Sequence, residues 1–275
     1  MQKEYLIEAV TNFVRQSPEN YIQKEYAISE ELIGIKIYDD PLFAFGSADD
    51  EYFSLFKSPE GIGNHFLKPQ EWLPSAKTVI SFFLPFSEQV KTSNCADKMW
   101  PSNEWLHARI EGQNFLCKIA YYLQDELKKA GYDSVIPVLD QRFWSKTAPD
   151  GESALSFTSN WSERHVGFAC GLGTFSLSKG LITEKGMAGR IGSLVTDLQL
   201  SATERKYKDI YEHCIKCGAC IRQCPVNAIS KESGKNHLIC SSFLDKLREK
   251  YQPRYGCGKC QVNVPCSSRI PKPGR

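Results

Sequence analysis

The stretch 214–225 reads CIKCGACIRQCP and places cysteines at Cys214, Cys217, Cys220 and Cys224, with Pro225 directly after the last. This is the spacing of bacterial ferredoxins, in which three thiolates hold one [4Fe–4S] cluster and the fourth ligates a second cluster. Structural zinc is the alternative, but zinc ligands usually come as two separated pairs. Four cysteines within 11 residues therefore predict iron–sulfur chemistry.

Four further cysteines follow the ferredoxin-like stretch, and they complete a second ligand set. Ferredoxin logic assigns the first cluster to Cys214, Cys217, Cys220 and Cys266, and the second cluster to Cys224, Cys240, Cys257 and Cys260. Two clusters use all eight of these thiols. Two neighbouring clusters form a path for single electrons, so we expect an electron acceptor at its end.

The cysteines are unevenly distributed over the 275 residues. Only Cys95, Cys117 and Cys170 of the 11 cysteines lie before residue 214, and we expect these three to pack as small hydrophobic side chains. A secreted disulfide scaffold would spread its cysteines along a short chain. The first residues lack the basic and apolar regions of a signal peptide, and no apolar run approaches the roughly 18 residues of a membrane span. We therefore expect a cytoplasmic protein with no membrane partner.

Charge is uneven as well. Residues 201–275 hold 15 lysines and arginines against 6 acidic residues, a net charge of +9, which leaves −7 for residues 1–200. A basic segment can bind nucleic acid, but it can also offset anionic clusters and attract an acidic redox partner. We favour the second interpretation, so nucleic acid is not expected as a partner.

Hydrophobic patterning divides the chain into two domains. Helical spacing covers 2–15, about 101–130, 162–170 and a segment after Cys240, whereas residues 32–38, 78–84, 135–139, 181–183 and 193–198 have strand character. Helices and strands alternate before residue 201, which indicates an α/β (α+β) core. The charged, aperiodic stretch 201–209 is the expected boundary between domains 1–200 and 201–275.

Several short motifs are similar to those of epoxyqueuosine reductases and reductive dehalogenases. Besides the cysteines, WLPSAKTVIS at 72–81 with LPF at 84–86, PVLD at 137–140, ACGLG at 169–173, LIT at 181–183 and TDLQL at 196–200 follow that family's order. The resemblance covers roughly residues 70–266. It implies a nitroreductase-like α/β domain that holds cofactor and substrate, followed by a ferredoxin-like domain with two [4Fe–4S] clusters.

The resemblance also implies a cofactor and partners. In the better-known members cobalamin lies beside the nearer cluster and carries the demanding chemistry, while the protein supplies position and electrostatics. A low-potential ferredoxin- or flavodoxin-like donor would supply electrons, and a small molecule or a corrinoid would receive them.

Two departures from the family pattern change these expectations. The proton-donating aspartate of the epoxyqueuosine reductases corresponds to Ser134, and Asp133 stands one residue earlier, which on a strand points to the opposite face. The sequence ends nine residues after Cys266, so we expect it to lack the helical-repeat domain that grips tRNA.

Other residues have both a functional and a structural interpretation. Asp140, Glu163 and His165 are candidate acid–base groups, although an exposed first helical turn also explains the last two. Gly171 and Gly173 allow close approach of a cofactor, or simply end a helix. The glycine-rich stretch 186–192 with Arg190 indicates either a strand-linking loop or a site for a phosphate or cofactor side chain.

Three functions are consistent with these patterns. The first is an iron–sulfur reductase, with cobalamin the favoured cofactor. The second is a non-catalytic electron carrier or activator that re-reduces a corrinoid or another redox partner. The third is queuosine-type tRNA modification, which rests on family analogy and the basic segment.

Overall fold

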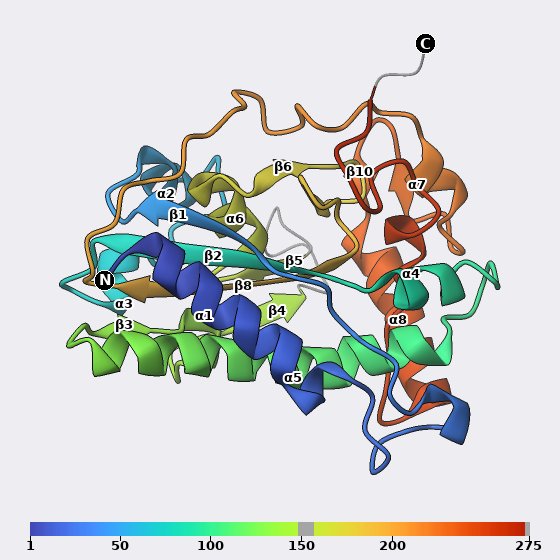
Figure 1. Ribbon diagram of the computed structural model, residues 1–275. Coiled ribbons are helices and arrows are strands. Elements are labelled where there is room, and N and C mark those ends of the chain that lie inside the picture. The colour runs from blue at the N-terminus through green and yellow to red at the C-terminus, as the bar shows by residue number, and fades with distance from the viewer. Residues whose placement is uncertain (148–156, 273–275) are drawn as a thin grey trace.

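A four-stranded antiparallel sheet forms the centre of the computed structural model, which describes residues 1–147 and 157–272 (Figure 1). Its strands are β1 (Leu42–Ser47), β2 (Thr78–Pro85), β3 (Ser134–Val135) and β8 (Gly189–Thr196), in the order β1-β2-β8-β3. The register pairs Leu84 with Arg190 and Pro85 with Gly189, so the end of β2 meets the start of β8.

Strand β2 is buried on both faces because every residue of TVISFFLP lies inside the molecule. Side chains alternate along a strand, so Ile80 and Phe82 join one hydrophobic cluster while Val79 and Phe83 join the other. The continuous apolar run therefore places the strand between two layers of helices.

Helices cover the two faces of the sheet. On one face lie α1 (Lys3–Gln16) and α5 (Asn103–Lys129), and on the other lie α2 (Glu51–Phe56) and α6 (Glu163–Cys170) (Figure 1). Ser102 caps α5 by accepting a hydrogen bond from the Trp105 amide at 3.2 Å. Gly171 ends α6 in the left-handed conformation, at φ 102°.

Shorter elements connect this framework. They are α3 (Pro69–Trp72), α4 (Glu88–Ser93), β4 (Ser145–Thr147), β5 (Phe157–Ser159), β6 (Gly173–Phe175), β7 (Leu181–Thr183) and the 3₁₀ helices η1 (Pro18–Asn20), η2 (Glu30–Leu32) and η3 (Pro137–Leu139). The cysteine-rich part adds α7 (Ala219–Arg222), β9 (Ile229–Ser230), β10 (Gly234–Lys235), α8 (His237–Tyr251) and η4 (Lys259–Gln261). None of the helices in the described part of the chain is long and apolar enough to cross a membrane.

The predicted α/β fold class is confirmed, but two predicted strands are wrong in detail. Residues 32–38 form only isolated bridges, because the Asn20 side chain accepts from the Tyr38 amide and donates to its carbonyl, and so occupies the groups a sheet partner would use. The predicted strand at 135–139 is shorter in the structure, where β3 ends at Val135 and Pro137 starts η3. Strand β1 was not predicted, because its segment has no clean alternation.

The stretch after residue 200 runs along the α/β core before it reaches the cysteines (Figure 1). Thr203 accepts a hydrogen bond from the Phe45 amide through Oγ1 at 2.9 Å, and the buried Tyr207 hydroxyl donates to the Phe168 carbonyl at 2.6 Å. Arg205 pairs with Asp50. The stretch proposed as a boundary is therefore tied to the first domain along its length.

Candidate functional site

The first group of cysteines surrounds Cys266. Burial, together with the nearby thiols of Cys214, Cys220 and Cys217, raises the pKa of the Cys266 thiol to about 12. Cys217 is exposed, whereas Cys220 and Cys266 are buried. The fold thus gathers the four residues assigned to the first cluster and leaves one of them at the surface.

The second group surrounds Cys240 and Cys260. Burial raises the pKa of Cys240, and Cys260 and Cys224 add to the effect. Burial likewise raises the pKa of Cys257 to about 12, with contributions from Cys260 and Cys240. The fold thus gathers the four residues assigned to the second cluster.

The two groups are more open than a site for one ion. Among residues 1–147 and 157–272, no three His, Cys, Asp or Glu side chains converge tightly enough for a single metal ion. A four-iron cube is wider than one ion, so its thiolates stand farther apart. Cluster binding would deprotonate these buried thiols, because thiolate is the ligand form.

A repeated Cys-Gly-x-Cys turn shapes both groups. Gly218 follows Cys217 with φ 72°, and Gly258 follows Cys257 with φ 66°. Successive backbone amides in such turns form concave anion sites that suit the sulfurs of a cluster. The sequence analysis missed this repeat, although CGAC at 217–220 and CGKC at 257–260 show it.

The second turn also packs directly on the α/β domain. A Cβ atom on Gly258 would lie 1.9 Å from Cζ2 of Trp105, which is on α5. Lys259 is buried, and its Nζ donates to the carbonyls of Asn94 and Asp97 at 2.7 Å each. The side-chain Nδ2 of Asn94 donates in turn to the Cys257 carbonyl at 3.0 Å. The loop of the second group is therefore fixed to the first domain.

Gly258→Ala should lower the free energy of unfolding by more than about 1–3 kcal/mol, because an overpacking clash adds to the left-handed backbone strain. Gly131→Ala is the matched control, since Gly131 has φ 83° and a Cβ there would meet nothing within 4 Å. Chemical denaturation of both variants measures the difference. Equal losses in the two variants would contradict the contact with Trp105.

A cavity of about 680 Å³ lies between the central sheet with its helices and the cysteine-rich part of the chain. Its walls come from the end of β2, the start of β8, the first turns of α5 and α6, and the cysteine-rich part. All four cysteines of the second group line it, namely Cys224, Cys240, Cys257 and Cys260, and none of the first group does. The second group therefore faces the place where a ligand could bind.

Four basic side chains line the cavity: Arg109, Arg164, Arg190 and Lys235. Arg164 lies deep in the molecule, yet water inside the open cavity reaches it. Burial lowers its pKa, and the nearby Cys260 and Cys240 oppose that shift. Lys235 donates to Sγ of Cys260 at 3.6 Å. The cavity is therefore strongly cationic.

Among residues 1–147 and 157–272, Glu163 is the one acidic side chain in the cavity lining. Both of its carboxyl oxygens are buried, and neither has a hydrogen-bond partner among the described residues. Burial raises the pKa of Glu163 to about 8, and the nearby Ser193 hydroxyl opposes this only in part. Glu163 is thus a neutral carboxylic acid at pH 7, able to give up a proton.

The other two acid–base candidates lie elsewhere. Asp140 accepts two hydrogen bonds from Arg142, both at 2.8 Å, which lower its pKa to about 2. Burial and the adjacent Arg164 lower the pKa of His165 to about 4, and its ring contacts Phe56 and Phe175. Neither side chain lines the cavity. Asp140 is therefore ionised at neutral pH, and His165 is a neutral imidazole packed against aromatic rings.

The candidate cofactor glycines also serve the fold. Gly171 caps α6, and a Cβ on Gly173 would lie 2.0 Å from the Ile182 carbonyl oxygen of the paired strand β7. Neither glycine reaches the cavity. Ser134 lies in β3, and Asp133 is exposed beside it, so neither replaces the missing aspartate in the cavity.

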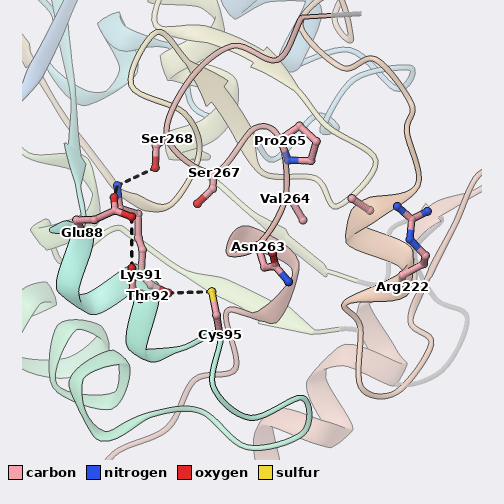
Figure 2. A pocket seen from close by; sticks show the side chains of 11 residues that line it. Glu88, Lys91, Thr92, Cys95, Arg222, Asn263, Val264, Pro265, Ser267 and Ser268 are labelled. Atoms are coloured by element: carbon pink, nitrogen blue, oxygen red, sulfur yellow. Dashed lines mark hydrogen bonds and ion pairs between the residues drawn. The ribbon is translucent and has the colours of Figure 1, made fainter. Parts of the chain in front are cut away.

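A second hollow, of about 530 Å³, opens at the surface beside the first group (Figure 2). Ala219 and Arg222 of α7 and residues 263–268 around Cys266 form one side, and α4 forms the other. Figure 2 shows Lys91 reaching across it to Ser268, where Nζ donates to Oγ at 2.8 Å. The hollow thus lies next to the segments that carry Cys220 and Cys266, although neither thiol lines it.

Arg109 and Arg164 line the cavity, but neither was predicted as a site residue. Arg109 carries no local signal, since it is one charged residue on a long amphipathic helix. Arg190 was noted only for its glycine-rich context, with its role left open. The register that sets Arg190 opposite Leu84 at the end of the sheet brings it to the cavity.

Comparison with known proteins confirms the predicted resemblance. A family model described as a 4Fe-4S binding domain matches residues 207–230. The chain is 26% identical over 227 residues to the epoxyqueuosine reductase of Vibrio cholerae and 25% identical over 230 residues to that of Cellulophaga algicola. These matches cover 74% and 76% of this chain, and 53% and 65% of the relatives. The chain thus spans less than two thirds of their length.

Solved structures share the fold. The epoxyqueuosine reductase of Streptococcus thermophilus matches with a TM-score of 0.55 at 16% identity, over all of this chain and 69% of that one. A catabolic reductive dehalogenase matches with a TM-score of 0.52 at 13% identity, over 98% of this chain and 37% of that one. An epoxyqueuosine reductase solved with a tRNA stem loop matches with a TM-score of 0.51 at 19% identity, over 96% of this chain and 65% of that one. The chain is therefore similar to iron–sulfur proteins of the epoxyqueuosine reductase and reductive dehalogenase kind.

Proposed function

We propose that this protein is an iron–sulfur reductase that passes single electrons through two [4Fe–4S] clusters to a cofactor or substrate in the cavity between its domains. Cys214, Cys217, Cys220 and Cys266 hold the first cluster, and Cys224, Cys240, Cys257 and Cys260 hold the second. One observation carries the proposal: all four thiols of the second group line the cavity, so an electron leaving that cluster reaches a bound molecule directly.

The arrangement supports a direction of electron flow. The first group includes the exposed Cys217 and lies beside the surface hollow, whose lining includes Lys91 and Arg222. Lys91 pairs there with Glu88 at 2.9 Å, whereas Arg222 places a positive charge beside the exposed Cys217. Such a charge suits an acidic partner, because complementary charge steers association. A low-potential ferredoxin- or flavodoxin-like donor therefore delivers electrons at the first cluster, and the second cluster passes them to the cavity.

Glu163 supplies the proton that accompanies the electrons. Reduction of an organic group needs protons as well as electrons, and a buried neutral carboxyl in the cavity is suited to donate one. After donation Glu163 is a carboxylate, and water in the cavity reprotonates it. In this proposal the proton donor is Glu163, whereas in the family motif it is an aspartate.

Cobalamin is the cofactor that the resemblance implies, and the lining suits its chemistry. The aromatic side chains of Trp105 and Phe143 suit contact with a flat ring, and the side-chain amides of Gln113 and Gln261 suit hydrogen bonds with its amide arms. When bound, it would supply a metal centre that accepts single electrons. The volume is in the range for drug-sized ligands, so a whole cobalamin, with roughly ninety non-hydrogen atoms, requires the cavity to widen.

Titration of the anaerobically reconstituted protein with cob(II)alamin tests this cofactor. Binding in the cavity should change the corrinoid absorption spectrum in a saturable way. Phe143→Ala, at a half-buried lining residue, should weaken the spectral change, whereas Trp100→Ala, at an exposed tryptophan that does not line the cavity, should leave it unaltered. An unchanged spectrum at every concentration would remove cobalamin and leave direct reduction of a substrate.

A non-catalytic electron carrier is the alternative. The cavity favours the reductase, since a carrier needs only exposed clusters and no enclosed acid such as Glu163. Steady-state turnover distinguishes the reductase from the carrier. A reductase turns over substrate with the electron donor alone, whereas a carrier needs a second protein.

Reduction of a modified tRNA base is a second candidate function. Three curated relatives carry the name epoxyqueuosine reductase, and a similar structure was solved with a tRNA stem loop. The expectation that nucleic acid is not a partner is therefore unsupported. Binding of tRNA should weaken steeply with salt, and a gel shift at low salt measures it; no shift there would end this candidate.

A further inference from the structure

The four cations of the cavity fall into two pairs. Arg164 and Lys235 lie beside the thiols of Cys240 and Cys260. Both thiols raise the pKa of Arg164, and Lys235 donates a hydrogen bond to Sγ of Cys260. A thiolate-ligated cluster carries net negative charge. The second cluster therefore compensates this pair.

Arg109 and Arg190 form the other pair, and their hydrogen-bond partners are neutral. Arg109 donates to the Tyr255 hydroxyl at 2.7 Å and stacks on that ring, and Arg190 donates to the Gln113 side chain. No carboxylate pairs with either guanidinium within residues 1–147 and 157–272. Glu163 is neutral and does not compensate them.

The two guanidiniums are close enough to affect each other. Burial and the nearby Arg109 together lower the pKa of Arg190 to about 10, so Arg190 stays charged at neutral pH. Beside them the buried Tyr38 hydroxyl has no hydrogen-bond partner among the described residues. Both side chains are half-buried in the cavity lining. Two like charges held close together repel each other, and the described residues supply no counter-charge, so this end of the cavity favours an anion.

We infer that the end of the cavity formed by Arg109 and Arg190 binds a negatively charged group, a carboxylate or a phosphate, of the small molecule that the second cluster reduces. Planar guanidiniums suit such groups because they bind two oxygens at once. With its anionic group held there, the molecule extends toward Glu163 and the second cluster. The assignment of the ligand as the reduced molecule rests on the proposed function; the anion site itself does not.

Binding of small probe anions to the cluster-reconstituted protein tests the site. Calorimetric titration at fixed ionic strength would compare benzoate and inorganic phosphate with benzamide, the uncharged counterpart of benzoate. We expect at least one of the anions to bind at least tenfold more tightly than benzamide. Arg190→Gln and Arg109→Gln should each weaken that binding at least tenfold, and Arg190→Lys should weaken it less.

Arg269→Gln is the matched control, because it removes an exposed arginine outside the cavity. It should bind the anion as the wild type does. Failure of both anions to bind better than benzamide, or unaltered binding in the two cavity variants, would overturn the site. Iron content and cluster reduction, measured on the same samples, report separately on the proposed function, so a protein with two reducible clusters and no anion binding would refute this inference alone.

Discussion

Cys240→Ser should leave the anaerobically reconstituted protein with about four irons per chain instead of about eight, because each [4Fe–4S] cluster needs four ligands. Cys240 stands alone between the two cysteine-rich runs, so sequence spacing gives it the least support of the eight ligands. The structure places it beside Cys260 and Cys224. Loss of the second cluster should also abolish turnover, since electrons would stop at the first.

Iron and sulfide analysis, with EPR of the reduced protein, measures this outcome. Wild type should show interacting signals from two clusters, and the variant a single one. Cys170→Ser is the control, since this buried thiol packs against Gly46 far along the sheet and should retain about eight irons per chain. A wild type with about four irons, or a Cys240→Ser protein that retains eight, would contradict the two-cluster assignment.

Glu163→Gln should lower turnover by roughly 10²–10⁴-fold, the usual contribution of a positioned proton donor, while cluster content and cluster reduction stay unaltered. Glutamine keeps the shape of the side chain but has no acidic proton. In the wild type, turnover should fall as the pH rises through about 8, the pKa of Glu163. The variant should lose this pH dependence. Equal turnover in the two proteins would remove Glu163 as the donor.

The same pKa shift has a consequence for stability. Between the ordinary carboxyl pKa of 4.5 and the folded value of about 8, the unfolded chain ionises while the folded chain stays protonated. The unfolded state is therefore favoured as pH rises through this window. Glu163→Gln should be increasingly stable relative to wild type from pH 5 to pH 8, with no further change above. Glu8→Gln, at an exposed position, should show no such trend in denaturation experiments at several pH values.

Local sequence determined the parts of the molecule that depend on spacing and periodicity. The apolar run 78–85 requires burial on both faces, and the capped amphipathic stretch 103–129 requires a helix, so both were predictable. The cysteine spacing predicts two sets of ligands, and within 214–224 and 257–260 the prediction is local, because turns between nearby cysteines are set by the residues between them.

Tertiary structure alone decided which side chains meet in the cavity. Asp140 and Glu163 are both acidic residues near the predicted motifs, yet Asp140 pairs with Arg142 and Glu163 lies unpaired in the cavity. Arg109, Arg164 and Arg190 come from two helices and a strand, far apart in sequence, and meet only because antiparallel pairing of β2 and β8 sets the end of the sheet against the cysteine-rich part. Sequence patterns report local geometry, whereas burial and charge pairing depend on contacts between distant residues.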